Sequence, residues 1–151
     1  MNLPFALKLI RQRSAFFMGF LRAKYGKKAF PLLSDLFITT RCNSRCRYCY
    51  VDKGIKSEDE MTTGQWIETI DSLIGLGCRM FNLMGGEPLL RQDFPEIMGH
   101  IVDRNILCDV NTNCYLVPEH LSTLVRASQI FTSLDGDEEA HDMNRGEGAF
   151  R

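Results

Sequence analysis

Short strand-like runs alternate with longer segments of helical periodicity from residue 35 to the end of the 151-residue chain. The strand-like runs are "DLFIT" (35–39), "RMFNLM" (79–84), "ILCDVNTN" (106–113) and "QIFTSLDG" (129–136). A helical segment separates each run from the next, an order that favours parallel strands joined by right-handed crossovers. The sequence therefore predicts an α/β fold built on one parallel sheet.

The helical segments carry start and stop signals. Thr62 and Gln65 have capping-box spacing ahead of an apolar helical face, and Gly77 closes that segment. Pro95 and Pro118 stand where the next two helices are expected to begin, a position that suits proline because the first N–H groups of a helix have no partner within it. We expect three crossover helices between the four strands.

Polar and unusual residues gather where the predicted strands end. They occupy residues 42–49, 85–87, 111–113 and 133–135. In parallel α/β folds, chemistry gathers at this edge of the sheet, where the strands give way to loops. We therefore expect one site at this edge. The polar segment 52–60 is expected to be a loop that leads into the first crossover helix.

Three of the six cysteines lie in the first of these clusters, spaced Cys42-x3-Cys46-x2-Cys49. A structural zinc site usually has four protein ligands, and a conventional ferredoxin cluster takes four cysteines. The histidines of the chain lie elsewhere, at His100, His120 and His141. The spacing leaves two alternatives open: a zinc site, or an iron–sulfur cluster with one iron free to bind a reacting group.

Residues 1–34 differ in charge from the rest of the chain. They contain seven of the 18 Lys and Arg residues and none of the 19 Asp and Glu residues. Leu3, Leu7, Ile10, Phe17 and Leu21 recur at roughly helical spacing. We predict a basic amphipathic helix in this segment. It could lie on an anionic membrane surface, or simply pack on the domain that follows at residues 35–151.

Composition excludes several classes of protein. The chain is 44% hydrophobic with a formal net charge of −1, and no run reaches the length of a membrane-spanning helix. Its clustered and scattered cysteines do not have the pattern of a secreted disulfide scaffold. We expect a cytoplasmic protein that binds no nucleic acid, with peripheral membrane contact through the N-terminal helix as an option.

Three motifs resemble those of the radical S-adenosylmethionine (SAM) superfamily. "CNSRCRYC" has the three cysteines with an aromatic residue before the third, and "GGEP" at 85–88 is similar to the SAM-amine motif. "SLDGDEEAHDMNRG" (133–146) resembles the fourth-strand segment of the branch that includes molybdenum-cofactor biosynthesis protein A and the SPASM-type peptide-modifying enzymes. The resemblance covers roughly residues 35–151 and implies a partial (β/α) barrel of TIM type.

The resemblance also implies cofactors and an activity. Cys42, Cys46 and Cys49 would hold a 4Fe-4S cluster whose open iron binds the amino and carboxylate groups of SAM. Reductive cleavage of SAM would then give a 5′-deoxyadenosyl radical that takes a hydrogen atom from an unknown small-molecule or peptide substrate. The electron would come from an external donor of the flavodoxin or ferredoxin type. The alternatives are a non-catalytic cluster-binding or SAM-binding module, and a zinc-binding interaction domain.

The resemblance assigns further positions to SAM. Tyr48 would line the adenine side, Gly85 and Gly86 would let the backbone approach SAM, and Glu87 would accept a hydrogen bond from its ammonium group. The remaining candidates are Asn113, Ser133 and Asp135 for the ribose and carboxylate. Arg145 would pair with the SAM carboxylate or cap a loop.

The sequence departs from the family pattern at two points. Cys114 stands where relatives often have glycine, which puts a strained turn there in doubt. The chain also has about four βα units, whereas the family core is a (β/α)6 barrel, so we expect a truncated barrel from a longer enzyme with an exposed strand edge. Cys78 and Cys108 are expected to be small core residues.

Overall fold

The computed structural model describes residues 3–26, 30–51 and 59–151. The helices are α1 (Leu3–Tyr25), α2 (Thr63–Leu76), α3 (Phe94–Asp103), α4 (Val117–Leu124) and α5 (Glu138–Arg145), with a short 3-10 helix η1 (Pro88–Leu90). The strands are β1 (Leu33–Thr39), β2 (Met80–Gly85), β3 (Leu107–Asn111) and β4 (Gln129–Phe131). Most of the predicted loop at 52–60 lies outside the described residues.

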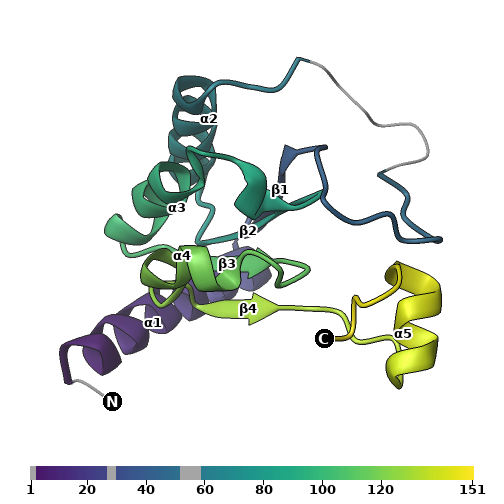
Figure 1. Cartoon of the computed structure of the whole chain (residues 1–151). Coiled ribbons are helices and arrows are strands. Elements are labelled where there is room, and N and C mark those ends of the chain that lie inside the picture. Colours follow the sequence, from purple (N-terminus) through teal and green to yellow (C-terminus); the bar gives the residue numbers. More distant parts are fainter. Residues whose placement is uncertain (1–2, 27–29, 52–58) are drawn as a thin grey trace.

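The four strands form one parallel sheet in the order β1-β2-β3-β4 (Figure 1). Leu36, Leu83, Val110 and Ile130 are in register across it. The first three side chains of this row are buried, whereas Ile130 on β4 is 45% exposed. The predicted α/β fold with a partial TIM-type barrel is confirmed, and β4 forms one edge of the sheet.

Helices α2, α3 and α4 follow one another along the sheet, and their apolar residues share a core with it. The capping box at Thr62 and Gln65 is present as predicted. Gly77 ends α2 in the left-handed region at φ 113°, where a Cβ would lie 2.8 Å from the Phe30 ring. Glycine is therefore required at this position for both its backbone conformation and its lack of a side chain.

Helix α1 lies against the amino-terminal edge of the sheet. The buried side chain of Gln12 donates a hydrogen bond to the carbonyl of Ile106 at 3.1 Å, immediately before β3. Gly19 packs beside Leu32 and Arg79, which immediately precede β1 and β2. The strand ends that carry the predicted site lie at the opposite edge. Helix α1 therefore supports the base of the sheet and takes no part in that site.

Two predictions about the C-terminal region need correction. Strand β4 ends at Phe131 rather than at residue 136, because its partner β3 ends at Asn111, which is opposite Phe131. The chain then turns at Gly136, with φ 135°, and forms α5, a helix that the sequence analysis did not predict. The Asp137 carboxylate caps α5 by accepting from the Ala140 N–H at 3.0 Å. Helix α5 is thus placed next to the predicted site (Figure 1).

Candidate SAM and cluster site

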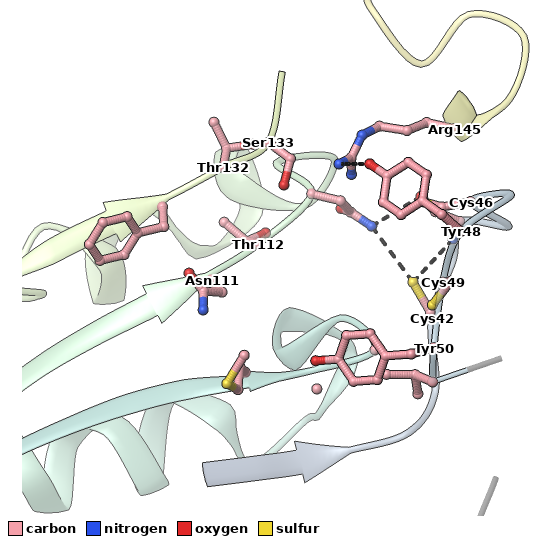
Figure 2. Close-up of a pocket in the computed structure, with 17 residues that line it drawn as sticks. Cys42, Cys46, Tyr48, Cys49, Tyr50, Asn111, Thr112, Thr132, Ser133 and Arg145 are labelled. Atoms are coloured by element: carbon pink, nitrogen blue, oxygen red, sulfur yellow. Dashed lines mark hydrogen bonds between the residues drawn. The ribbon is translucent and has the colours of Figure 1, made fainter. Parts of the chain in front are cut away.

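A cavity of about 380 Å³ opens at the carboxyl-terminal edge of the sheet (Figure 2). Residues at the ends of β2, β3 and β4 line it, and so do the cysteine loop at 42–51, which follows β1, and Arg145 of helix α5. The predicted residues in its wall are Cys42, Cys46, Tyr48, Cys49, Gly85, Gly86, Asn113, Ser133 and Arg145. Glu87 and Asp135 are not part of the wall. The structure therefore brings nine of the eleven predicted residues to one cavity.

The three thiols of the cysteine loop share this cavity but are not assembled into a preformed site. No group of three or more His, Cys, Asp or Glu side chains converges on one point in the described parts of the chain. Cys42 is exposed, while Cys46 and Cys49 are half-buried. Burial raises the pKa of the Cys42 and Cys46 thiols, and at Cys46 the Arg145 charge acts in the opposite direction. All six cysteines are free of disulfides.

Asn113 joins the end of β3 to the cysteine loop. Its side-chain amide donates to Oδ1 of Asn43 at 2.7 Å and to the Ser44 hydroxyl at 3.2 Å, and it lies 4.0 Å from the Cys42 sulfur. Its main-chain N–H donates to the Glu87 carboxylate at 2.7 Å. Asn113 therefore connects the first half of the cysteine loop to the interior of the domain.

Glu87 is fully buried beneath the cavity wall. Its carboxylate accepts hydrogen bonds from the Leu89 N–H at 3.0 Å, the Thr112 hydroxyl at 2.9 Å and the Asn113 N–H. Burial raises the pKa of Glu87, and these three donors oppose that rise by stabilising the charged form. This carboxylate holds neighbouring backbone in place, and Glu87 is not among the residues that line the cavity.

Gly85 and Gly86 lie in the cavity wall. Their lack of side chains is required by close contacts with the backbone of the chain itself. A Cβ on Gly85 would lie 2.1 Å from the Thr39 carbonyl, and one on Gly86 would lie 2.3 Å from the Arg41 carbonyl. The Gly86 N–H also donates to the Thr39 carbonyl at 2.9 Å. Side chains here would push the end of β2 away from the start of the cysteine loop. The pair therefore fixes where that loop leaves the sheet.

Tyr48, Asp135 and Arg145 form one cluster at the other side of the cysteine loop. The Tyr48 hydroxyl donates to Asp135 at 2.7 Å, and Arg145 donates to both Asp135 oxygens, at 2.9 Å and 3.1 Å. Arg145 also donates to the Tyr48 hydroxyl (Figure 2). The Arg145 hydrogen bond holds the pKa of Asp135 below its usual range. Arg145 is thus paired within the protein, with Asp135 and Tyr48.

The sequence analysis missed several residues of the cavity wall. Tyr50, Val51, Met84, Phe131 and Thr132 also line it, and so does Asn111, which lies in the predicted polar cluster at 111–113 without a predicted role. Met84, Asn111 and Phe131 come from the neighbouring strands β2, β3 and β4, and Asn111 and Phe131 are in register with each other. The alternation of side chains along each strand could have identified them, because successive residues of a strand point to opposite faces.

The remaining cysteines separate into two kinds. Cys78 and Cys108 are fully buried in the core, as predicted, and burial raises the pKa of the Cys108 thiol. Cys114 is exposed. The sequence put a strained turn at this position in doubt, but Cys114 has a φ of 73°, so the strained turn is present. The turn forms with a residue that is strained in the left-handed region. The Cys114 N–H donates to the Thr112 hydroxyl at 3.0 Å, which helps to hold it.

The sequence match agrees with this geometry, and the chain belongs to the radical SAM superfamily, whose family model matches residues 36–151. The chain is similar to the Fe-coproporphyrin III synthase of Methanosarcina barkeri, with 33% identity over 118 residues covering 75% of this chain and 30% of that protein. It is also similar to the GTP 3′,8-cyclase of Cyanothece, with 37% identity over 107 residues covering 65% and 32%. The chain thus spans about a third of the length of these relatives.

Solved structures give the same assignment of the fold. Streptococcus suis SuiB bound to the precursor peptide SuiA superposes with a TM-score of 0.69 at 17% identity, covering 87% of this chain and 31% of that one. The anSMEcpe structure with bound AdoMet superposes with a TM-score of 0.63 at 26% identity, covering 79% and 35%. The predicted family is confirmed, and so is its branch that includes molybdenum-cofactor biosynthesis protein A and the SPASM-type enzymes. Enzymes of this family use a 4Fe-4S cluster and SAM.

Proposed function

We propose that this chain binds a 4Fe-4S cluster through Cys42, Cys46 and Cys49 and cleaves SAM bound to the open iron. The observation that carries the proposal is the donor set of the cavity. Three thiols line it, and no fourth cysteine, histidine or carboxylate among the described residues does. A three-thiolate set leaves one coordination position for a reacting ligand. Arg145, the one charged side chain in the described wall, suits an anionic cluster and the carboxylate of SAM.

The remaining wall residues receive supporting roles. Gly85 and Gly86 present backbone to SAM at the end of β2, and Ser133 and Asn113 offer polar groups to its ribose and carboxylate. The ring of Tyr48 borders the adenine side. When bound, the reduced cluster supplies the electron that splits SAM into methionine and a 5′-deoxyadenosyl radical, which abstracts hydrogen from a substrate.

The substrate of the whole protein is a small molecule or a peptide. The family supports both, since the curated relatives above are named for a porphyrin and a nucleotide, whereas SuiB was solved with a precursor peptide. We propose that Met84, Asn111 and Phe131, which line the cavity, contact the substrate. We propose a cytoplasmic protein, since free thiols near a cluster need a reducing compartment.

Anaerobic reconstitution with iron and sulfide tests the activity. We expect dithionite and SAM to yield 5′-deoxyadenosine and methionine in equal amounts, and no product without the reductant. A cluster that binds but cleaves no SAM would instead favour a non-catalytic cluster module. Stoichiometric zinc with no visible absorbance would contradict the iron–sulfur assignment and support a zinc-binding domain.

An acidic one-electron carrier of the flavodoxin or ferredoxin type is the proposed electron donor. The side chains of Arg45 and Arg47, which flank Cys46 in the sequence, are exposed on the cysteine loop. Opposite charges speed association at low ionic strength. We expect the double change Arg45→Gln/Arg47→Gln to slow reduction by a reduced flavodoxin and to weaken its salt dependence, while reduction by dithionite is unchanged. Equal rates with the carrier would contradict this partner.

Helix α1 is proposed to contact an anionic membrane surface. Ile10 and Phe17 are 61% and 57% exposed. Ile10 comes two positions before the buried Gln12, and Phe17 comes two positions before the buried Gly19. Two positions correspond to about 200° around a helix, so each apolar side chain lies on the side of α1 opposite to the buried residue. The apolar row therefore points away from the domain. Exposed cationic residues flank the row on both sides, namely Arg11, Arg13, Arg22 and Lys24.

This arrangement matches an interfacial helix, with apolar residues outward and cations beside them. No helix in the described residues is long and apolar enough to cross a membrane. We expect Ile10→Ser/Phe17→Ser to lower flotation with phosphatidylglycerol vesicles about tenfold. The matched control is Leu121→Ser/Val125→Ser, which changes two equally exposed residues at α4. Equal flotation of the wild-type chain with neutral and anionic vesicles would contradict the proposal.

A further inference from the structure

Helix α5 is fastened to the cysteine loop at two points. The first is the cluster of Tyr48, Asp135 and Arg145. The side chains of Asp135 and Arg145 are 15% and 14% exposed. The second is a main-chain hydrogen bond from the Arg47 N–H to the Asn144 carbonyl at 2.8 Å. Residues 47 and 48 lie between Cys46 and Cys49. The fastening therefore acts on the part of the loop that carries two of the three thiols.

The α5 side of this connection is itself held in place. The Asp135 N–H donates to Nδ1 of the buried His141 at 3.2 Å, so the backbone before α5 is tied to the helix. Asp142 accepts from the main-chain N–H groups of Gly148 and Phe150 at 2.7 Å and 2.9 Å. These contacts fix the segment on both sides of Arg145. A side chain mounted on a fixed segment can hold its charge at a constant place.

The place of the guanidinium is defined by three contacts. Asp135 holds it from one side with two charge-assisted hydrogen bonds, the Tyr48 hydroxyl accepts a further bond, and the Tyr48 ring lies 5.6 Å from it. Arg145 and Cys46 share the cavity wall. Tyr48 is two residues from Cys46, so these contacts hold the guanidinium next to the part of the loop that carries this thiol.

We propose that Arg145, held by Asp135 and Tyr48, fastens α5 to the cysteine loop and sets the reduction potential of the cluster by placing its charge beside Cys46. The inference rests on the proposed function, because it requires a cluster on Cys46. A cation near a cluster sulfur stabilises the more negative, reduced state, and the potentials of such clusters depend on the charges and hydrogen bonds around them. Arg145 is thus a positioning residue, and its effect on the cluster potential should already be present in the SAM-free protein.

The test measures two quantities in SAM-free protein. The first is the midpoint potential of the reconstituted cluster. We expect Arg145→Gln to shift the reduction equilibrium about tenfold toward the oxidised cluster, which corresponds to about 59 mV for one electron. Arg145→Lys keeps the charge and should restore most of the shift. Arg126→Gln is the matched control, because Arg126 is paired with Asp103 and does not line the cavity. An unchanged potential in Arg145→Gln would overturn the proposal.

The second quantity is the hydrogen-exchange protection of the Arg47 amide in the cluster-free chain. Its N–H donates to α5, so it reports directly on the fastening. We expect Arg145→Gln and Tyr48→Phe to lower this protection about tenfold, since each removes hydrogen bonds to a charged group. Arg126→Gln should leave it unchanged. Unchanged protection in both test variants would overturn the fastening, whereas a wild-type chain that takes up no cluster would refute the proposed function alone.

Discussion

The main-chain N–H of Asn113 donates to the buried carboxylate of Glu87 at 2.7 Å, which joins the ends of β2 and β3. The side-chain amide of Asn113 continues the connection to Asn43 on the cysteine loop. Two motifs that are 26 residues apart in the chain, at 87 and 113, are thereby linked to the thiols. Glu87 is a structural anchor for the site, even though it lies outside the cavity wall.

Replacing Glu87 by glutamine should destabilise the fold. The amide cannot accept from both the Leu89 and Asn113 N–H groups as the carboxylate does, so a buried donor loses its charged acceptor. We expect the free energy of unfolding to fall by about 2 kcal/mol in urea titrations. Glu68→Gln, on the exposed face of α2, is the control and should have no effect. Equal stability of the Glu87 variant and the wild type would show that this anchor is dispensable.

The fold could be predicted from the sequence because its signals are local. Strand runs, the capping box at Thr62 and the helix-initiating Pro95 and Pro118 each depend on neighbouring residues. Helix α5 was missed because its sequence is almost entirely polar, and His141 is its one buried residue. The Asp137 cap was the available signal, and it is weak without an apolar face to follow it.

Part of the candidate site could also be predicted, because some of its residues form a local sequence motif. Cys42, Cys46 and Cys49 are close in sequence, so any fold places them near one another. The places of Glu87 and Asp135 depended on contacts between distant segments. Whether a carboxylate faces a cavity or a buried N–H group is decided by packing that no local pattern records.

Asp93 should contribute more to the free energy of unfolding than an exposed aspartate does. It accepts two hydrogen bonds from Arg91, at 2.8 Å and 2.6 Å, and the Arg91 side chain is 6% exposed. Arg91 also donates to the carbonyl of Ile38. We expect Asp93→Asn to lower the free energy of unfolding by about 2 kcal/mol, because the buried Arg91 loses two charge-assisted hydrogen bonds and keeps only the longer ion pair with Glu60 at 3.5 Å. Asp71→Asn, at an exposed ion pair with Arg104, should cost less than about 1 kcal/mol.

The same carboxylate gives a pH dependence. The Arg91 hydrogen bonds hold the pKa of Asp93 below its usual range, so the unfolded chain binds this proton more readily than the folded one. Its contribution is therefore complete above the ordinary aspartate pKa of about 3.9 and is lost as the pH falls through the lower, folded value. Urea midpoints of wild type and Asp93→Asn should converge as the pH is lowered. A constant difference down to the acid limit would contradict this assignment.

Cys114→Gly should stabilise the chain. Cys114 has a φ of 73°, which costs a residue with a Cβ about 1–2 kcal/mol, while glycine adopts it freely. After the greater flexibility of glycine in the unfolded chain is deducted, we expect a gain of about 0.5–1 kcal/mol in urea unfolding. Asn105, with a φ of 58°, provides the control, since asparagine tolerates this region and Asn105→Gly should gain less. A loss of stability in the Cys114 variant would contradict the strain.

The iron content of the chain after anaerobic reconstitution tests the central claim most directly, with Cys46→Ala compared against Cys114→Ala. Cys46 lines the cavity, whereas Cys114 is an exposed thiol outside its wall. We expect about four irons per chain in the wild type and in Cys114→Ala, and loss of the cluster in Cys46→Ala. A full complement of iron in Cys46→Ala would contradict the assignment of Cys42, Cys46 and Cys49 as the three ligands of the cluster.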